Sequence, residues 1–202
     1  VNKRERFSMA LVMGTDYADM VFNKETVQNI YNGNYNFFKP PLKPTLSAIP
    51  GNKRVFLYWN DISERSYDNF LRKYDFEGYL LYRSEEPEFN DIKTITNSKG
   101  EAKFWKPIAQ FDLKDGIKGS DPIGVRMLEG ASFWRGSDNG LQHSYIDTTV
   151  VNGKAYYYAL VAYDQGDPNY GTLGLMPTET PKVISQNFSG QAQGKIFHND
   201  RT

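Results

Sequence analysis

The segment Asn152–Asp164, which reads NGKAYYYALVAYD, constrains the fold of this chain more than any other segment. An Asn-Gly pair favours a tight turn, and the aromatic and β-branched residues after it favour a strand. Side chains alternate between the two faces of a strand. One face would carry Tyr156, Tyr158, Leu160 and Ala162, and the other Tyr157, Ala159, Val161 and Tyr163. Because both faces are apolar, both must be covered.

Composition excludes several classes of function. The chain has 202 residues, enough for one large domain or one domain with an appendage, and 39% of them are hydrophobic. Lys and Arg together number 24, as do Asp and Glu, so no net charge draws the chain to nucleic acid or an anionic membrane. Without cysteine it has neither disulfides nor zinc-thiolate sites. No apolar run reaches the roughly 20 residues that span a bilayer.

The first residues are expected to form an extension of the main domain. The chain starts without Met or a signal-peptide core, which suggests a processed product or an excerpt of a longer polypeptide. The apolar run 7–13 predicts a short strand. Thr15 and Asp16 could cap a helical turn, and Asn23 is expected to be the N-cap of a short helix. Three prolines within 40–44 predict a stiff connector, where we place the main boundary.

The rest of the chain alternates between strand patterns and turn signals. Besides the strand that follows Asn152-Gly153, strands are expected at 54–59, 76–84, 92–95, 104–113, 145–151 and 177–184. Tyr and Phe at spacings of three and four predict a helical insertion at 61–75, whereas 114–140 predicts a long excursion with little regular structure. The expected layout is a strand-helix extension with a Pro-rich linker at 1–42, a main domain at 43–185 and a polar tail at 186–202.

Three motifs resemble fibronectin type III domains. They are Val55-x-Leu57-x-Trp59 after Pro50-Gly51, then Gly78-Tyr79-x-Leu81-Tyr82-Arg83, and Tyr145-x-Asp147 followed by Asn152-Gly153 and Tyr156. In that family they correspond to the second strand with its core Trp, the third strand, and the tyrosine corner. The resemblance covers 43–185, interrupted at 61–75 and 114–140, and implies a mainly β, antiparallel, immunoglobulin-like sandwich. The span exceeds the roughly 100 residues usual for such sandwiches, and 1–42 have no counterpart in the family.

Longer sandwiches of this kind are similar to modules of large secreted or surface proteins of bacteria. The resemblance therefore implies an extracellular or cell-surface location.

Catalytic residues are scarce. His143 is followed by Ser144, but neighbours on a strand point to opposite faces, which disfavours a catalytic triad. His198 lies in the polar tail. Glu85, Glu86 and Glu88 could imitate the carboxylate pair of a glycosidase, although acidic residues around a proline usually form a solvated loop. No glycine-rich phosphate loop is present. We therefore expect no enzyme, and assign no catalytic, cofactor-binding or metal-binding residue.

We expect no cofactor, and the alternative is that the protein binds calcium. Three stretches place carboxylate and amide oxygens close together in the sequence, as calcium requires. They contain Asp164, Asp167 and Asn169; Asp112, Asp115 and Asp121; and Asp138 with Asn139. None matches the EF-hand pattern, and the same residue types also favour turns.

The functional hypotheses depend on what covers the outward face of the sheet. Leu80 and Tyr82 should adjoin Tyr157, Val161 and Tyr163 in one apolar patch, larger than a monomer usually exposes. The N-terminal helix or the 114–140 excursion is expected to cover it, and otherwise a partner would.

The first hypothesis is a non-catalytic module of a secreted or cell-surface protein that acts in scaffolding, adhesion or assembly. Its partners would be other domains of the parent protein or neighbouring subunits. The alternative is a carbohydrate-binding module, with Trp105 and Trp134 stacking on a polysaccharide, or an accessory domain of a glycoside hydrolase.

Overall fold

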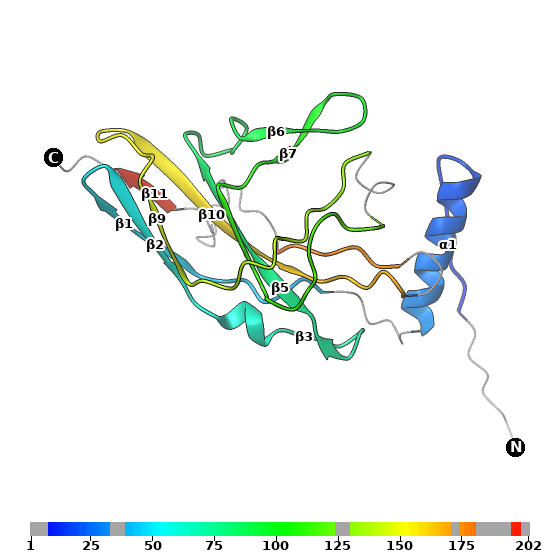
Figure 1. The fold of residues 1–202 in the computed structure, drawn as a ribbon. Helices are drawn as coiled ribbons and strands as arrows, with labels where there is room; N and C mark the ends of the chain where they lie inside the picture. Colours follow the sequence, from blue (N-terminus) through cyan, green and yellow to red (C-terminus); the bar gives the residue numbers. More distant parts are fainter. Residues whose placement is uncertain (1–7, 33–38, 124–129, 171–173, 181–194, 199–202) are drawn as a thin grey trace, which may run out of the picture. The chain divides into compact units, whose positions relative to one another are not determined.

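The computed structural model describes residues 8–32, 39–123, 130–170, 174–180 and 195–198, and it is mainly β with antiparallel sheets (Figure 1). The chain divides into two compact units. The first comprises residues 1–38 with 69–71, and the second comprises the remaining residues.

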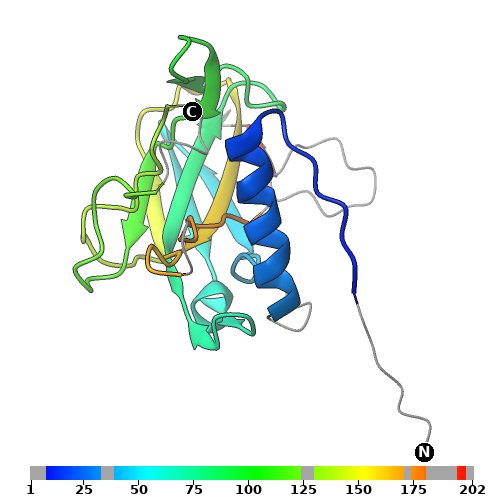
Figure 2. The same ribbon diagram turned by 90° about the vertical axis from the view of Figure 1, so that its right-hand side faces the viewer.

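The first unit contains one helix, α1 (Tyr17–Asn32), which Figure 2 shows as uninterrupted. Asp16 Oδ1 accepts a hydrogen bond from the backbone N–H of Asp19, and Asp19 Oδ2 accepts one from the N–H of Thr15. This reciprocal cap starts the helix before Asn23, so the prediction of Asn23 as N-cap was wrong. Asn23 instead donates to the carbonyl of Met13 at 2.9 Å. Residues 8–13 form no strand, and Phe7 lies outside the described residues.

A three-stranded sheet in the second unit contains the predicted core Trp. Its order is β1 (Leu46–Gly51), β2 (Arg54–Trp59) and β9 (Ser144–Asp147). Val55, Leu57 and Trp59 alternate with more exposed residues and are buried, as predicted for 54–59.

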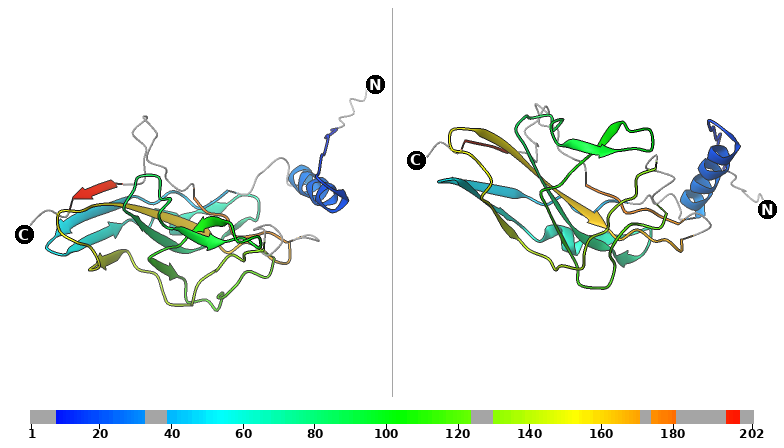
Figure 3. Two further views of the ribbon diagram at one scale, coloured as in Figure 1. Left: turned by 90° about the horizontal axis from the view of Figure 1, so that it is seen from above. Right: turned by 45° about the horizontal axis from the view of Figure 1, so that its top comes forward.

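A four-stranded sheet has the order β11 (Lys195–His198), β10 (Ala155–Asp164), β5 (Phe76–Ser84) and β8 (Ala109–Asp112) (Figure 3). Strands β5 and β10 are the predicted ones. Strand β11 lies in the segment predicted to be a polar tail, and His198 pairs there with Ala155.

One hydrophobic core joins the two sheets. Trp59 packs against Tyr79 of β5 and Phe111 of β8, with ring centroids 6.0 and 5.6 Å apart. The predicted inward face of β10 belongs to this core: Tyr156, Tyr158, Leu160 and Ala162. Beside the Asn152-Gly153 turn, the Tyr156 hydroxyl accepts a hydrogen bond from the N–H of Val151 at 3.0 Å.

Segment 61–75 is not a helical insertion. It holds one 3₁₀ turn, η1 (Ile62–Arg65), and two short strands, β3 (Tyr67–Asp68) and β4 (Lys73–Tyr74). Tyr67 pairs with Tyr74 across these strands, with ring centroids 5.2 Å apart. The spacing that suggested one helical face therefore reflects a cross-strand pair.

The strand predicted at 104–113 is two strands with a break at Lys106-Pro107. Strand β7 (Ala102–Trp105) pairs with β6 (Lys93–Thr96), whereas β8 pairs with β5. The described part of 114–140 forms no strand and only isolated bridges, such as that between Ser120 and Trp134, as predicted. In 177–184, residues 177–180 form only a bridge from Glu179 to Tyr163, and 181–184 lie outside the described residues.

The outward face of β5 and β10 has its own core. Leu80, Tyr82, Ala159, Val161 and Tyr163 are buried there with Phe89. Ile92, Trp105, Phe133 and Tyr157 pack around them. Cover from the 114–140 excursion is confirmed by Phe133, and the segment around β6 and β7 adds cover that the sequence had not indicated.

Candidate ligand pocket

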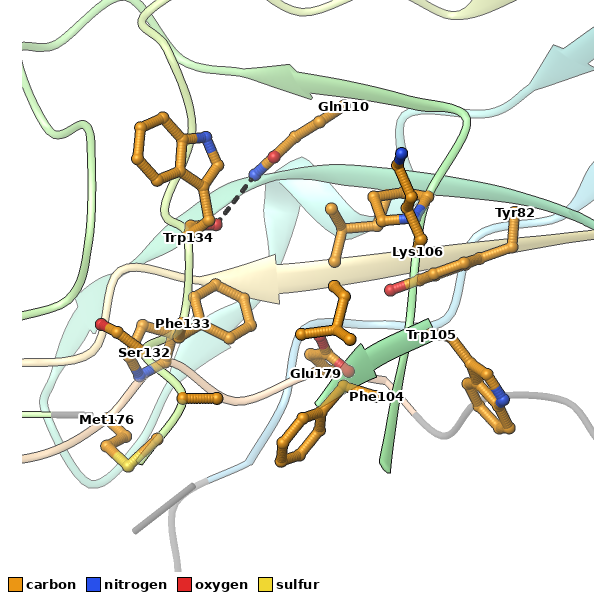
Figure 4. Close-up of a pocket in the computed structure, with 15 residues that line it drawn as sticks. Tyr82, Phe104, Trp105, Lys106, Gln110, Ser132, Phe133, Trp134, Met176 and Glu179 are labelled. Carbon is orange, nitrogen blue, oxygen red and sulfur yellow. Dashed lines mark hydrogen bonds between the residues drawn. The ribbon is translucent and has the colours of Figure 1, made fainter. Parts of the chain in front are cut away.

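A pocket of about 520 Å³ opens beside this second core (Figure 4). Five aromatic residues and several aliphatic ones line it, with few polar groups. The lining residues are Leu80, Tyr82, Ile95, Phe104, Trp105, Lys106, Pro107, Gln110, Ala131, Ser132, Phe133, Trp134, Met176, Pro177 and Glu179. The pocket is therefore formed by residues of β5, β6, β7 and β8, by the excursion and by segment 176–179.

Strand β5 supplies two of the buried lining residues. Leu80 and Tyr82 lie on the outward face of β5 and are 5% and 3% exposed. Burial, and then the negative charge of Glu179, raise the pKa of the Tyr82 hydroxyl well above its usual value. Tyr82 therefore stays neutral at physiological pH, and Figure 4 shows its hydroxyl directed towards the middle of the pocket.

Segment 104–107 forms one wall. The Trp105 ring packs edge-on against Tyr82, with centroids 6.4 Å apart, and lies at the same distance from Phe89. Phe104 pairs with Ile95 across β6 and β7, and both line the pocket. Strand β7 pairs with β6, whereas β8 pairs with β5. A single regular strand through Lys106 could not have made both pairings, so the break there allows this wall to form.

Hydrogen bonds fix the opposite wall, which carries Phe133 and Trp134. Gln110 Nε2 donates to the carbonyl of Trp134 at 3.1 Å and to the Tyr163 hydroxyl at 2.7 Å (Figure 4 draws the first bond). The Tyr163 hydroxyl in turn donates to the carbonyl of Arg135 at 2.6 Å. Gly78 leaves room for this ring, since a Cβ there would lie 2.8 Å from the Tyr163 oxygen. Trp134 is thus held through its backbone, while its side chain is 52% exposed.

The same wall is anchored further along the excursion. The Ser132 hydroxyl donates to the carbonyl of Asp121 at 2.9 Å, and the N–H of Asp121 donates to the carbonyl of Phe133 at 2.7 Å. Asn139 accepts from the N–H of Asp112 and donates to the carbonyl of Gln110, so it occupies the outer edge of β8. The edge strand is therefore blocked against further strand pairing.

A second pocket, of about 440 Å³, has several charged residues in its lining and adjoins a buried ion pair. Its lining includes Arg83 and Asp147, whose atoms Nη1 and Oδ2 lie 2.9 Å apart. Asp147, 2% exposed, also accepts hydrogen bonds from Thr149 and from the Tyr158 hydroxyl. Because these bonds already occupy the carboxylate, we read the network as structural.

The structure gives His143 no nucleophilic partner. His143 Nε2 lies 2.5 Å from Glu64 Oε1, which also accepts a hydrogen bond from the Tyr79 hydroxyl at 3.0 Å. Ser144 is exposed at the start of β9.

The acidic run after β5 belongs to a turn. Glu85 pairs with Lys154 at 2.6 Å, and Ser84 Oγ bonds the backbone of Glu86. Neither Glu85 nor Glu86 nor Glu88 lines either pocket.

The residues considered for calcium serve mainly as turn acceptors. Asp164 accepts from the N–H groups of Gly166 and Thr178, and Asp167 from that of Asn169. Asp112 accepts from the N–H groups of Asp138 and Asn139. In the described part of the chain, no three His, Cys, Asp or Glu residues are grouped so that they could hold a metal ion.

Comparison with known proteins gives no relative: no family model, no curated protein and no solved structure matches the chain. Among the described helices, none has the length and apolar character needed to cross a membrane.

Sequence reasoning named Trp105 and Trp134 as binding candidates, and both line the pocket. It also placed Leu80 and Tyr82 on the outward face. It missed Phe104, Phe133 and Met176 as lining residues, because no local sequence signal indicates which residues of separate segments come together in the folded chain.

Proposed function

We propose that this chain is a non-catalytic binding module of a secreted or cell-surface protein, which docks an apolar side chain of a partner protein in the aromatic pocket. The observation that carries the proposal is the pocket itself, about 520 Å³ and lined mainly by aromatic and aliphatic side chains. Pockets of this size and composition are typical binding sites.

The strand arrangement supports the module type in this proposal. Sheets of three and four antiparallel strands share a core around Trp59, and the hydroxyl of Tyr156 bonds the backbone five residues upstream. An immunoglobulin-like sandwich of the fibronectin type III kind would have these features. The extracellular location rests on the resemblance alone.

The lining favours an apolar occupant over a sugar. A sugar can stack on aromatic rings, but it also brings hydroxyl groups that need hydrogen-bond partners once they are buried. Both N–H bonds of the Gln110 amide are already donated, to Trp134 and to Tyr163. Leu80, Ile95 and Met176 offer no hydrogen bonds at all, so burial against them would cost a sugar free energy.

The rim favours a protein segment over a small molecule. Trp134 and Ile95 are 52% and 41% exposed, so apolar surface continues beyond the cavity. Lys106 and Glu179 add opposite charges to the lining, which suits a peptide backbone that brings both donors and acceptors. An aromatic anchor pocket surrounded by such a rim is the usual centre of a protein interface.

A selection experiment tests the proposal. The full chain is panned against a phage-displayed library of random linear peptides, and the affinity of the enriched peptides is measured by calorimetry. We expect the peptides to share a large apolar residue, and Trp134→Ala to weaken their binding by about tenfold or more.

Tyr58→Ala is the matched control, because Tyr58 is similarly exposed (46%) but lies on the three-stranded sheet. Equal loss of affinity in both variants would contradict the proposal, as would failure to enrich any apolar motif. Retention on a polysaccharide that Trp134→Ala abolishes would instead support the carbohydrate-binding alternative, which the half-exposed Trp134 ring favours.

A further inference from the structure

The end of the four-stranded sheet contains a buried carboxyl group that takes part in none of the interactions described above. Glu77 of β5 is 0% exposed, and neither of its carboxyl oxygens has a hydrogen-bond partner. An ionised carboxylate in this situation would lose its hydration at a large cost in free energy. The group must therefore be neutralised in the folded protein.

The surroundings of Glu77 are predominantly negative. Asp112 of β8 and Asp115 of the turn that follows both disfavour a charge on Glu77. Arg135 of the excursion favours a charge on Glu77; its Nη2 donates to the carbonyl of Lys118 at 3.3 Å, and its buried Nε has no hydrogen-bond partner. After β10, the neutral side-chain amide of Gln165 donates to Asp115 at 2.9 Å and also acts on the Glu77 carboxyl group, lowering its pKa. Burial, then Asp115, raise the pKa of Glu77 to about 8.

A second acid group lies close by on the same strand end. Asp75, immediately before β5, is 3% exposed, and its carbonyl accepts a hydrogen bond from the N–H of Gln165 at 2.8 Å. Burial, then Asp164 and Asp68, raise the pKa of Asp75 to about 7, whereas Lys73 lowers it. Burial raises the pKa of Asp164 to about 6, although the hydrogen bonds that it accepts from Thr178 and Gly166 lower it.

We propose that a proton on the Glu77 carboxyl group holds this end of the sheet closed, and that loss of the proton opens the backbone contacts of 112–116 and 134–140. The hydrogen bond from the N–H of Leu113 to the carbonyl of Glu77 (2.9 Å) and that from Gly140 to Asp112 (2.9 Å) are the contacts released. Segment 134–140 begins at Trp134, so the pocket wall responds to pH.

The sign follows from the two states. In the open state Glu77 has its ordinary pKa of 4.5, and in the closed state about 8. The closed state therefore holds one more proton between these values, and its advantage is lost as the pH rises through that interval. The equilibrium constant for opening should rise by about tenfold per pH unit and level off above about pH 8.

Hydrogen exchange measures this opening directly. The intrinsic exchange rate itself rises about tenfold per pH unit, so the logarithm of the observed rate at Leu113 and Gly140 should rise with a slope of about 2 between roughly pH 5 and 8. In Glu77→Gln, which mimics the protonated acid, the slope should fall towards 1, and any excess that remains would come from Asp75 and Asp164, whose raised pKa values lie in the same interval. Glu85→Gln, a change at an exposed paired acid, should leave the slope of the wild type unchanged.

Equal slopes in the wild type and Glu77→Gln would overturn the proposal. A steep slope at all amides, including those of β2, would show that the whole fold opens and not only this end of the sheet, and it would overturn the proposal. Disappearance of the steep slope on adding calcium chloride would show that a cation, not a proton, neutralises Glu77. If Glu77→Gln does not fold, the ¹³Cδ resonance of Glu77 in the wild type decides: a midpoint near its ordinary value would refute the proposal.

Discussion

Replacing Asp147 with Asn should destabilise the fold severely, because a single carboxylate holds several donors in the interior. Asp147 Oδ1 accepts from the N–H and the hydroxyl of Thr149 at 2.9 and 2.7 Å. Its Oδ2 accepts from Arg83 Nη1 at 2.9 Å and from the Tyr158 hydroxyl at 2.8 Å. Asn has one acceptor oxygen, and its NH₂ group would face donors.

The magnitude follows from the burial of the partners. Asp147 is 2% exposed, and the Arg83 side chain only 23%. Removing one member of a buried ion pair while the other stays typically costs about 3–5 kcal/mol. We expect a loss in that range for Asp147→Asn. Tyr158→Phe, which removes one hydrogen bond and leaves the ion pair, should cost about 1–2 kcal/mol.

Urea unfolding of the wild type and both variants, followed by fluorescence and circular dichroism, measures these losses. Burial alone would raise the pKa of Asp147, but the bonds from Thr149 and Tyr158 and the charge of Arg83 lower it below its ordinary 3.8. The stability that Asp147 contributes is therefore present above pH 3.8 and is lost as the pH falls through the lower, folded value. A loss below about 1 kcal/mol for Asp147→Asn at neutral pH would refute the reasoning.

Two further variants test the core and the pocket wall. Trp59→Ala should lower the free energy of unfolding by about 3–5 kcal/mol in urea titrations, because the ring is buried between the sheets; a loss under about 1 kcal/mol would contradict that role. Gly136→Ala should cost roughly 2–4 kcal/mol, since Gly136 has φ 133° and an added Cβ would lie 2.2 Å from Asp112 Oδ2. Its thermal midpoint should drop accordingly, and an unchanged midpoint would show that the wall can shift freely.

The alternation of side chains was the most reliable signal in the sequence. It assigned every residue of 156–163 to the correct face, and it identified Val55, Leu57 and Trp59 as core residues. These predictions succeed because a strand with two apolar faces has few alternatives in water.

Local signals failed where two interpretations compete. Asn23 is a good N-cap residue, but the pair Asp16 and Asp19 caps the helix earlier and Asn23 bonds the preceding segment. Tyr67 and Tyr74 are spaced as on a helix, but two short strands place them opposite each other. In both cases contacts between separate parts of the chain decide the outcome.

The pocket could be predicted only in part for the same reason. Trp105 and Trp134 stood out as aromatic residues on insertions. Their convergence with Phe104, Phe133 and Met176 depends on the break at Lys106-Pro107 and on the bonds of Gln110. Glu77 gave no signal at all, because a single acid in a strand is ordinarily exposed.

The most direct test of the docking pocket is to locate a bound peptide by NMR. The chain is mixed with the tightest peptide from the library selection, and nuclear Overhauser effects between the two molecules are recorded. We predict contacts from the apolar side chain of the peptide to the Met176 methyl group and the Trp134 indole. Contacts confined to Tyr58 and Ile146, on the exposed face of the other sheet, would contradict the proposed function.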